Sequence, residues 1–251
     1  MALPLIQLHN ISYKYEQTQA LIDINLVIKE GDFLAIIGPN GSGKSTLLKI
    51  MLGLLKPSNG NVLLFGKPAN QFKEREWIGY VSQKSNSFNT GFPATVSEVV
   101  RSGVVKQIGL FKRFPDDVKI QVRQALKAVG MEDFAQKNSG GQQQRVFITR
   151  AVISNPKVLI LDEPTVGIDS KNVRSFYNML VHLNREHNIS IVLVTHDVDA
   201  VSTSISHVAC LNQRIHFHGF KKDMESMSEE QLESWYGHSV RKVEHQGEVQ
   251  S

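Results

Sequence analysis

The sequence is poor in cysteine and in long apolar runs. Its single cysteine, Cys210, excludes an intramolecular disulfide and any zinc site built from several cysteines, so we expect a reducing compartment. The longest unbroken apolar runs, such as residues 158–161 and 191–194, fall far short of the ~20 residues that cross a bilayer. The opening residues lack the basic start and apolar core of a secretory signal. We therefore expect a soluble chain that another protein must hold at any membrane where it works.

An excess of charge of one sign is also lacking. Lysine and arginine number 28 against 24 acidic residues, a formal net charge of +4, which is too small to indicate nucleic-acid binding by itself. His216 and His218 share one face of a predicted strand, but no third ligand is evident, and we interpret them as surface residues rather than a zinc site. Basic and aromatic residues alternate in one short stretch, which we interpret as an exposed loop rather than a single-strand binding surface. The residues of this stretch are Lys106, Phe111, Lys112, Arg113 and Phe114.

The chain is instead rich in short apolar segments that alternate with amphipathic stretches. With 251 residues, 41% of them hydrophobic and 21% charged, it has the composition of a globular protein of one large or two small domains. Ile22, Ile24, Leu26 and Ile28 recur at every second position, interrupted by the polar residues Asp23, Asn25 and Lys29, which predicts that all four face one side of a half-buried strand. Further strands are predicted at residues 33–37, 61–65, 78–81, 158–161, 190–194, 207–211 and 215–217, and helices at 46–52, 118–129, 142–153, 173–185 and around 229–233. This alternation predicts an α/β fold with a mainly parallel sheet and a helical insertion at about 88–150.

A glycine-rich loop stands between the strand predicted at 33–37 and the helix that follows. It fits G-x-x-x-x-G-K-[ST], in which backbone N–H groups turn inward around a triphosphate at a helix N-terminus. We expect Lys44 to reach the β- and γ-phosphates and the Ser45 hydroxyl to bind Mg²⁺. The motif consists of Gly38, Pro39, Asn40, Gly41, Ser42, Gly43, Lys44 and Ser45.

Two carboxylates follow the apolar strand predicted at 158–161. They emerge at its carboxyl end, where open α/β sheets bind ligands. Asp162 is suited to the Mg²⁺ shell, and Glu163 to positioning or deprotonating an attacking water. Alone, such a pair indicates only a strand that meets a polar loop; together with the glycine-rich loop it indicates a nucleotide site.

A second helix start able to bind an anion is formed by Ser139, Gly140, Gly141 and Gln142. With the two preceding motifs, this one makes the chain resemble an ATP-binding-cassette (ABC) ATPase, and the four residues resemble that family's signature motif. The resemblance covers about residues 5–219. It implies an ABC-type P-loop NTPase fold, with a mainly parallel sheet core, an antiparallel β-subdomain and a helical subdomain. The ATP-binding domain would span residues 1–225, with a polar tail at 226–251.

The resemblance also assigns roles to residues that are weak signals singly. Tyr15, with Tyr13 as the competing candidate, matches the aromatic residue that stacks on adenine, and Thr46 joins the nucleotide-binding set. Gln83 matches the glutamine that touches Mg²⁺ and the water and senses the transmembrane partner. Asp169, after Gly167 and Ile168, matches the loop that crosses the dimer interface, and His196 the histidine that contacts the γ-phosphate. Two subunits would then pair head to tail, with Ser139 of one capping the γ-phosphate held by Lys44 of the other.

A free-standing cassette resembles the ATPase subunit of a bacterial importer. The resemblance implies a homodimer that uses ATP and Mg²⁺ at the cytoplasmic face of the membrane, a polytopic permease, and an outside metal-binding protein that delivers the substrate. Residues 80–83, 92–100 and 141–147 resemble the zinc and manganese uptake branch: zinc is the first expectation, manganese the second, and an iron chelate a further alternative. A non-transport ATPase that acts on nucleic acid is the remaining hypothesis, although we expect no nucleic-acid partner.

Two further expectations concern loops. Residues 85–100 follow Gln83 and carry Phe88, Phe92 and Val96 among polar residues, so we expect this segment to contact the permease; a packed loop is the alternative. The family usually has a leucine before the signature serine and a longer connection to it. Here the connection 131–138 is short and Asn138 replaces the leucine, which predicts weak ATP-driven dimerisation and slow hydrolysis unless the loop reroutes.

Overall fold

Two sheets form the scaffold of the protein. The computed structural model describes residues 3–83, 94–105, 116–136, 143–166, 168–195, 205–228 and 230–231. The strands are β1 (Pro4–Tyr15), β2 (Thr18–Lys29), β3 (Phe33–Ile37), β4 (Asn59–Leu64), β5 (Lys67–Pro68), β6 (Ile78–Val81), β7 (Val158–Asp162), β8 (Ser190–Thr195), β9 (His207–Asn212) and β10 (Arg214–Phe220). The helices are α1 (Lys44–Met51), α2 (Val96–Arg101), α4 (Asp116–Ala128), α5 (Gln143–Val152), α6 (Ser170–Glu186) and α7 (Lys221–Glu225), with short turns η1 (Arg75–Trp77), η3 (Ser102–Val104) and η4 (Glu132–Phe134).

The six-stranded sheet has the order β10-β9-β3-β8-β7-β6 and is parallel from β9 to β6. The three strands in its middle, β3, β8 and β7, are buried at every residue. Successive side chains of these strands point alternately into two cores, one on each face of the sheet. Because both faces are covered, such a strand needs a continuous apolar run. The α/β fold with a mainly parallel sheet is thereby confirmed.

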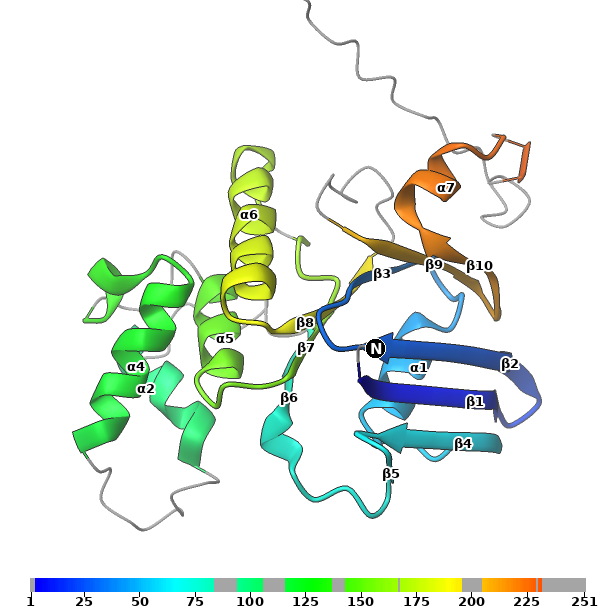
Figure 1. The fold of residues 1–251 in the computed structure, drawn as a ribbon, viewed down its shortest axis with the longest axis horizontal. Helices are drawn as coiled ribbons and strands as arrows, with labels where there is room; N and C mark the ends of the chain where they lie inside the picture. The colour runs from blue at the N-terminus through cyan, green and yellow to red at the C-terminus, as the bar shows by residue number, and fades with distance from the viewer. Residues whose placement is uncertain are drawn as a thin grey trace, which may run out of the picture.

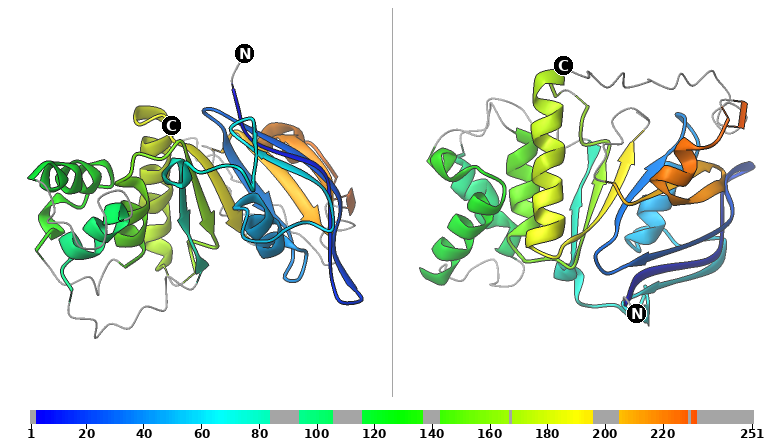
Figure 2. Two further views of the ribbon diagram at one scale, coloured as in Figure 1. Left: turned by 90° about the horizontal axis from the view of Figure 1, so that it is seen from below. Right: turned by 45° about the horizontal axis from the view of Figure 1, so that its top comes forward.

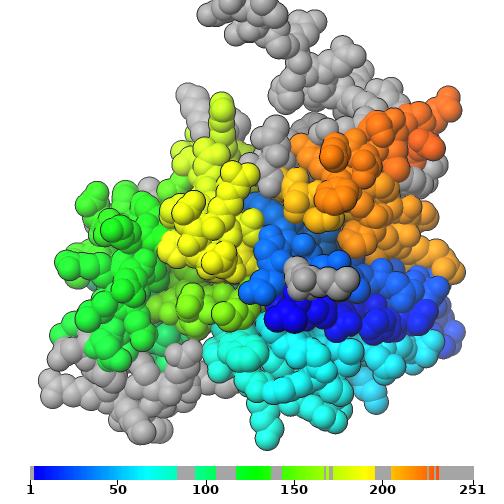
Figure 3. Space-filling view, in the orientation of Figure 1, coloured from blue at the N-terminus to red at the C-terminus, as the bar shows by residue number. Residues whose placement is uncertain are grey.

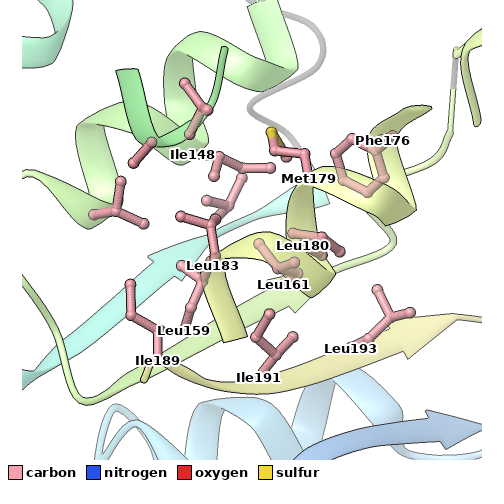
Figure 4. Close-up of a cluster of buried hydrophobic side chains, with 14 of the residues drawn as sticks. Ile148, Leu159, Leu161, Phe176, Met179, Leu180, Leu183, Ile189, Ile191 and Leu193 are labelled. Carbon is pink, nitrogen blue, oxygen red and sulfur yellow. The ribbon is translucent and has the colours of Figure 1, made fainter. Parts of the chain in front are cut away.

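Helices α5 and α6 cover one face of this sheet (Figure 1). Ile148 of α5 and Leu180 and Leu183 of α6 pack with Leu159 and Leu161 of β7 (Figure 4). Helix α1 contributes Leu47, Leu48 and Ile50 to the core on the other face.

The second sheet is antiparallel, with the order β2-β1-β4-β5, and its apolar face joins the same core as α1. It lies on the opposite side of the molecule from α2 and α4 (Figures 1 and 3). The antiparallel β-subdomain expected from the resemblance is therefore present. Helices α2, α4 and α5 lie side by side in all views (Figure 2) and fall within the predicted helical insertion. The boundaries of the domains stay a prediction.

One prediction about β2 is wrong in detail. Ile24, Leu26 and Ile28 are buried, but Ile22 is only partly buried and Leu21 takes the core position instead. The cause is an irregularity of the β1–β2 ladder, where Asp23 has a positive φ of 50° and the register shifts. A bulge changes which residues of a strand face the core.

The other predicted strands and helices are present within a few residues. Of the helix expected around 229–233, only residues 230–231 belong to the described part of the chain. Within the described ranges, no helix has the length and apolar character needed to cross a membrane.

Candidate nucleotide site

The loop between β3 and α1 is shaped by its glycines and held by a neighbouring turn. A Cβ atom on Gly38 would lie 2.0 Å from the Leu211 carbonyl oxygen, and Gly43 has a φ of 99°. Gln213, in the β9–β10 turn, donates its backbone N–H to the Ser42 carbonyl at 2.9 Å. The motif of the loop gives no indication of this hydrogen bond. Gln213 has a positive φ of 57°, which the turn between the two strands requires. The sequence of a turn, however, does not show which distant residues the turn contacts.

Lys44, the first residue of α1, points back into this loop. Its side chain is only 6% exposed, and Nζ donates to the carbonyl oxygens of Gly38 and Pro39 at 2.8 Å each. Burial lowers the pKa of the Lys44 ammonium, while Glu163 and Asp162 oppose that shift. A cation is thus held inside a ring of backbone groups, which suits the charge of a triphosphate.

Asp162, the last residue of β7, is 8% exposed. Burial, followed by the charge of Glu163, raises the pKa of its carboxyl, whereas Lys44 and Lys49 lower it. Among the described residues, its buried Oδ1 has no hydrogen-bond partner, and the same holds for Ser42 Oγ. A buried carboxylate oxygen without a donor is a suitable ligand for a hard divalent cation. The exposed Ser45 on α1 offers a hydroxyl oxygen, so the donor set fits Mg²⁺.

A hydrogen bond joins Glu163 to Gln83, because the two residues follow the carboxyl ends of neighbouring parallel strands. Gln83 Nε2 donates to Glu163 Oε2 at 3.0 Å, and β6 pairs with β7 in parallel. The backbone of Glu163 has a φ of 47°, and its N–H donates to the Val194 carbonyl at 2.9 Å. This left-handed conformation is rare for a residue other than glycine, and the hydrogen bond to β8 holds it in place.

Of the two tyrosines proposed for adenine stacking, Tyr15 is the more accessible. Tyr15 is 44% exposed, and its hydroxyl lies 3.4 Å from Thr46 Oγ1 on α1. Tyr13 packs against the core, and the two rings meet edge to face at 4.8 Å. Exposure beside α1 favours Tyr15.

Of the signature motif, Asp169 and His196, the structure describes only Asp169. Asp169 is exposed just before α6, and its carbonyl accepts the Asn172 N–H at 2.8 Å. The other predicted positions lie outside the described residues. They are Ser139, Gly140, Gly141, Gln142, Gly167 and His196.

The profile of the ABC transporter family matches residues 21–166, which include the glycine-rich loop, Gln83 and both carboxylates. The chain belongs to this family. This ABC ATPase is 51% identical over 219 residues to the "Zinc uptake system ATP-binding protein ZurA" of Listeria innocua, covering 86% of this chain and 85% of the relative. It is 41% identical over 213 residues to the "High-affinity zinc uptake system ATP-binding protein ZnuC" of Bacillus subtilis, covering 83% and 91%.

Solved ABC structures have the same fold. The structure of cbiO1 from Clostridium perfringens, described as part of the transporter complex cbiONQ, has 34% identity and a TM-score of 0.80, covering 91% of this chain and 92% of the other. The dimeric bacterial cassette MJ0796 has 31% identity and a TM-score of 0.73, covering 86% and 98%. The subunit is a nucleotide-binding ATPase of the ABC type.

Proposed function

We propose that this ATPase powers a bacterial importer of a divalent transition metal, with zinc as the cargo. The convergence of Lys44, Asp162, Glu163 and Gln83 at the carboxyl edge of the parallel sheet carries the ATPase part of the proposal. Zinc is supported by the likeness to ZurA and ZnuC, because no residue of this subunit is expected to touch the cargo while it crosses the membrane. Manganese, and then an iron chelate, are the alternatives.

In this proposal the residues of the site divide the work on ATP. The loop 38–43 offers backbone N–H groups to the phosphates, and Lys44 Nζ exchanges the carbonyls of Gly38 and Pro39 for phosphate oxygens. Glu163 orients a water and accepts its proton, and Gln83 holds the Glu163 carboxylate in place through the 3.0 Å hydrogen bond. Tyr15 supports the adenine ring.

Asp162 and Ser45, together with Gln83, are the residues proposed to hold Mg²⁺. The partnerless Oδ1 of Asp162 supports this assignment. When bound, the ion neutralises charge on the phosphate oxygens. Oδ1 of Asp162 would thereby gain the partner that it lacks among the described residues.

We further propose a head-to-tail homodimer at the cytoplasmic face of the membrane. The dimeric form of MJ0796 supports the pairing. Ser139, Gly140, Gly141 and Gln142 of one subunit would meet the γ-phosphate held by the other, with Asp169 at the interface and His196 on the same phosphate. ATP would act as part of the interface, and its hydrolysis would separate the subunits.

The proposed permease contact begins at the edge strand of the sheet. A groove of about 470 Å³ runs along β6 and α5, and its lining includes Tyr80 and Arg150. Tyr80 and nearby Trp77 are exposed aromatic residues, which are common at protein interfaces. Of the predicted segment 85–100, residues 85–93 lie outside the described part. Thr95, at the start of α2, is described and is the position chosen for a crosslinking cysteine. Its capture by the permease would support the contact, and labelling that ignores the permease would contradict it.

The experiment that tests the function is metal uptake by the bacterium that carries the gene. A strain lacking the gene, supplied with the wild-type subunit or with Glu163→Gln, is grown in chelated medium and its uptake of radioactive zinc and of manganese is measured. Zinc uptake restored only by the wild type supports the proposal. If the wild type restores manganese uptake alone, manganese and not zinc is the cargo. If it restores neither uptake, the result contradicts the proposal that the subunit belongs to a metal importer.

A further inference from the structure

A cleft of about 640 Å³ lies far from the nucleotide site. Its lining comes from α4, from the end of α5 and from the end of α6, and includes Asn155 and Ile189. These two residues precede β7 and β8, so the cleft opens at the amino edge of the parallel sheet. The residues of the nucleotide site lie at the carboxyl edge. Nothing in the ATPase chemistry uses this cleft.

Two histidines from one short segment stand together in its wall. His182 lies in the last turns of α6, and His187 is the first residue after that helix. Both side chains are exposed, and their rings are 5.3 Å apart between centroids, with planes inclined by 80°. An exposed pair of imidazoles is accessible to an ion from solvent.

The turn after α6 fixes this pairing. Asn188 has a φ of 52°, a conformation that asparagine tolerates better than most residues. The Asn184 amide donates to the Ile189 carbonyl at 3.0 Å, and the Ile189 N–H donates to the Leu183 carbonyl at 3.3 Å. Leu183 and Ile189 are buried in the core. The backbone that carries the two rings is therefore anchored before any ligand arrives.

The distance between the two ring centroids is that of an edge-to-face contact, and it also fits two imidazoles that ligate one tetrahedral ion. Zinc lies about 2.0–2.1 Å from a ligating nitrogen, and each nitrogen lies about 1 Å from its ring centre, so two ligands at the tetrahedral angle have centroids roughly 5 Å apart. The observed 5.3 Å agrees with this distance. Imidazole nitrogen is a preferred ligand of zinc, copper and nickel, and not of magnesium.

We propose that His182 and His187 form a binding site for a divalent transition-metal ion. Within the described ranges, no group of three His, Cys, Asp or Glu side chains is placed to hold a metal, so water or the amide oxygens of Gln121 and Gln124 on α4 complete the shell. Lys127 also lines the cleft, and its charge opposes a cation. The site therefore binds more weakly and reversibly than a site with four protein ligands.

The choice of zinc as the natural ion rests on the proposed function. A subunit that energises zinc import at the cytoplasmic face meets the cargo after it has entered. The pair would then report the metal already delivered, because Gln121 and Gln124 of α4 line the same cleft and an ion held with them would join α4 to α6. The binding site itself depends only on the residues of this chain.

The test is calorimetric titration of Zn²⁺ into the full-length, untagged, metal-stripped chain without nucleotide. We expect the His182→Gln/His187→Gln variant to lose one equivalent of bound zinc relative to the wild type, together with the zinc-dependent rise in melting temperature. The matched control is His216→Gln/His218→Gln, which removes the same number of histidines from β10. It should keep that equivalent.

Unchanged stoichiometry in the His182/His187 variant overturns the inference, as does loss of the same equivalent in the control. Melting curves without metal show whether each variant is folded. His182 and His187 are both exposed, so their replacement should leave the unliganded melting temperature within about 1–2 °C. The titration does not involve transport. A failure here leaves the proposed zinc import standing, and a failure of the uptake experiment leaves this site standing.

Discussion

The side-chain amide of Gln83 donates a 3.0 Å hydrogen bond to Glu163 Oε2, and so connects the residues that follow two paired strands. The backbone of Glu163 is also held in place, because its N–H donates a hydrogen bond to the Val194 carbonyl of β8. Gln83 lies just before residues 85–100, the segment expected to contact the permease. A displacement of that segment would therefore alter the hydrogen bonding of the residue proposed to activate water.

Glu163→Gln should retain ATP binding and stop turnover. The amide preserves the shape of the side chain but loses the negative charge that positions the water and accepts its proton, and general-base catalysis contributes roughly 10²–10⁴-fold. ATP turnover and the elution volume in size-exclusion chromatography with ATP are measured. We expect a dimer that does not separate. Glu132→Gln, an exposed change in η4, is the control, and normal turnover by Glu163→Gln would remove Glu163 from its assigned role.

Lys44→Ala should lose most of its nucleotide affinity. Charge-assisted hydrogen bonds contribute about 1.5–3 kcal/mol, which corresponds to a loss of roughly tenfold to a hundredfold in affinity. The measurement is binding of a fluorescent ATP analogue at fixed salt. Lys49→Ala, which removes an exposed cation from the same helix, should have a much smaller effect. Equal affinity of Lys44→Ala and the wild type would contradict the assignment of the loop.

The two tyrosines near α1 can be separated by their different burial. Tyr15→Ala should weaken ATP binding with little change in melting temperature, because base–aromatic stacking contributes about 1–3 kcal/mol and this ring is largely outside the core. Tyr13→Ala should mainly lower the melting temperature, since Tyr13 packs against the core. Tyr15→Trp should bind ATP nearly as well as the wild type. The reverse pattern would make Tyr13 the adenine contact.

The central strands and the nucleotide loop could be predicted because their signals are local. Residues 33–37 and 158–161 are apolar at every position, as burial on both faces of a sheet requires, and the loop motif follows the first of them directly. The sequence of β1 does not predict a strand as clearly. Its ladder with β2 contains several register shifts, which break the alternation that marks a half-buried strand.

Contacts between distant segments could not be predicted from the chain. The hydrogen bond from the Gln213 N–H to the Ser42 carbonyl joins two turns that are far apart in sequence. The influence of Lys49 on the Asp162 carboxyl and the pairing of Gln83 with Glu163 likewise depend on which strands become neighbours. A motif indicates which residue types are needed, whereas the sheet order decides which of them meet.

Asp162→Asn should stabilise the protein without ligand at neutral pH while removing its response to Mg²⁺. Burial and Glu163 raise the pKa of Asp162, so the native state holds this proton more tightly than the unfolded chain. Stability then falls as the pH rises from about 3.9, the ordinary value in an unfolded chain, through the raised pKa. Asp162→Asn does not lose stability in this way, because its amide carries no charge. The variant should therefore be more stable than the wild type at pH 7, and this difference in stability should vanish near pH 4.

Thermal melting across this pH range measures the effect. A gain of about 1 kcal/mol corresponds to roughly 2–4 °C for a chain of this size. With Mg²⁺ and ATP the order should reverse, because only the wild type gains a ligand for Oδ1. A lower melting temperature for Asp162→Asn than for the wild type at pH 7 without ligand would show that the buried charge is satisfied within the protein.

The last prediction concerns the short connection before Ser139. Its first part is firmly attached: Met131 is fully buried, and the Ala135 carbonyl accepts the N–H of Ser97 at 3.0 Å, at the start of α2. Asn138 stands where the family usually has an apolar leucine, and capping of a γ-phosphate needs donors held within hydrogen-bond range. A polar residue at the position of that anchor should leave the Ser139 helix start less firmly placed, while Lys44, on the other side of the site, is unaffected.

We therefore expect ordinary ATP affinity but weak ATP-driven dimerisation and slow turnover. The comparison protein has the usual longer, leucine-containing connection in place of 131–138, with Asn138→Leu as the minimal change. Both should hydrolyse ATP faster than the wild type and dimerise at lower ATP concentration, with the full replacement giving the larger increase. Asn138→Ala is the control, because it removes the polar group without restoring an apolar anchor of leucine's size. Equal turnover by the wild type and the longer connection would mean that the short loop reaches the same position by another route, and the predicted impairment would then be wrong.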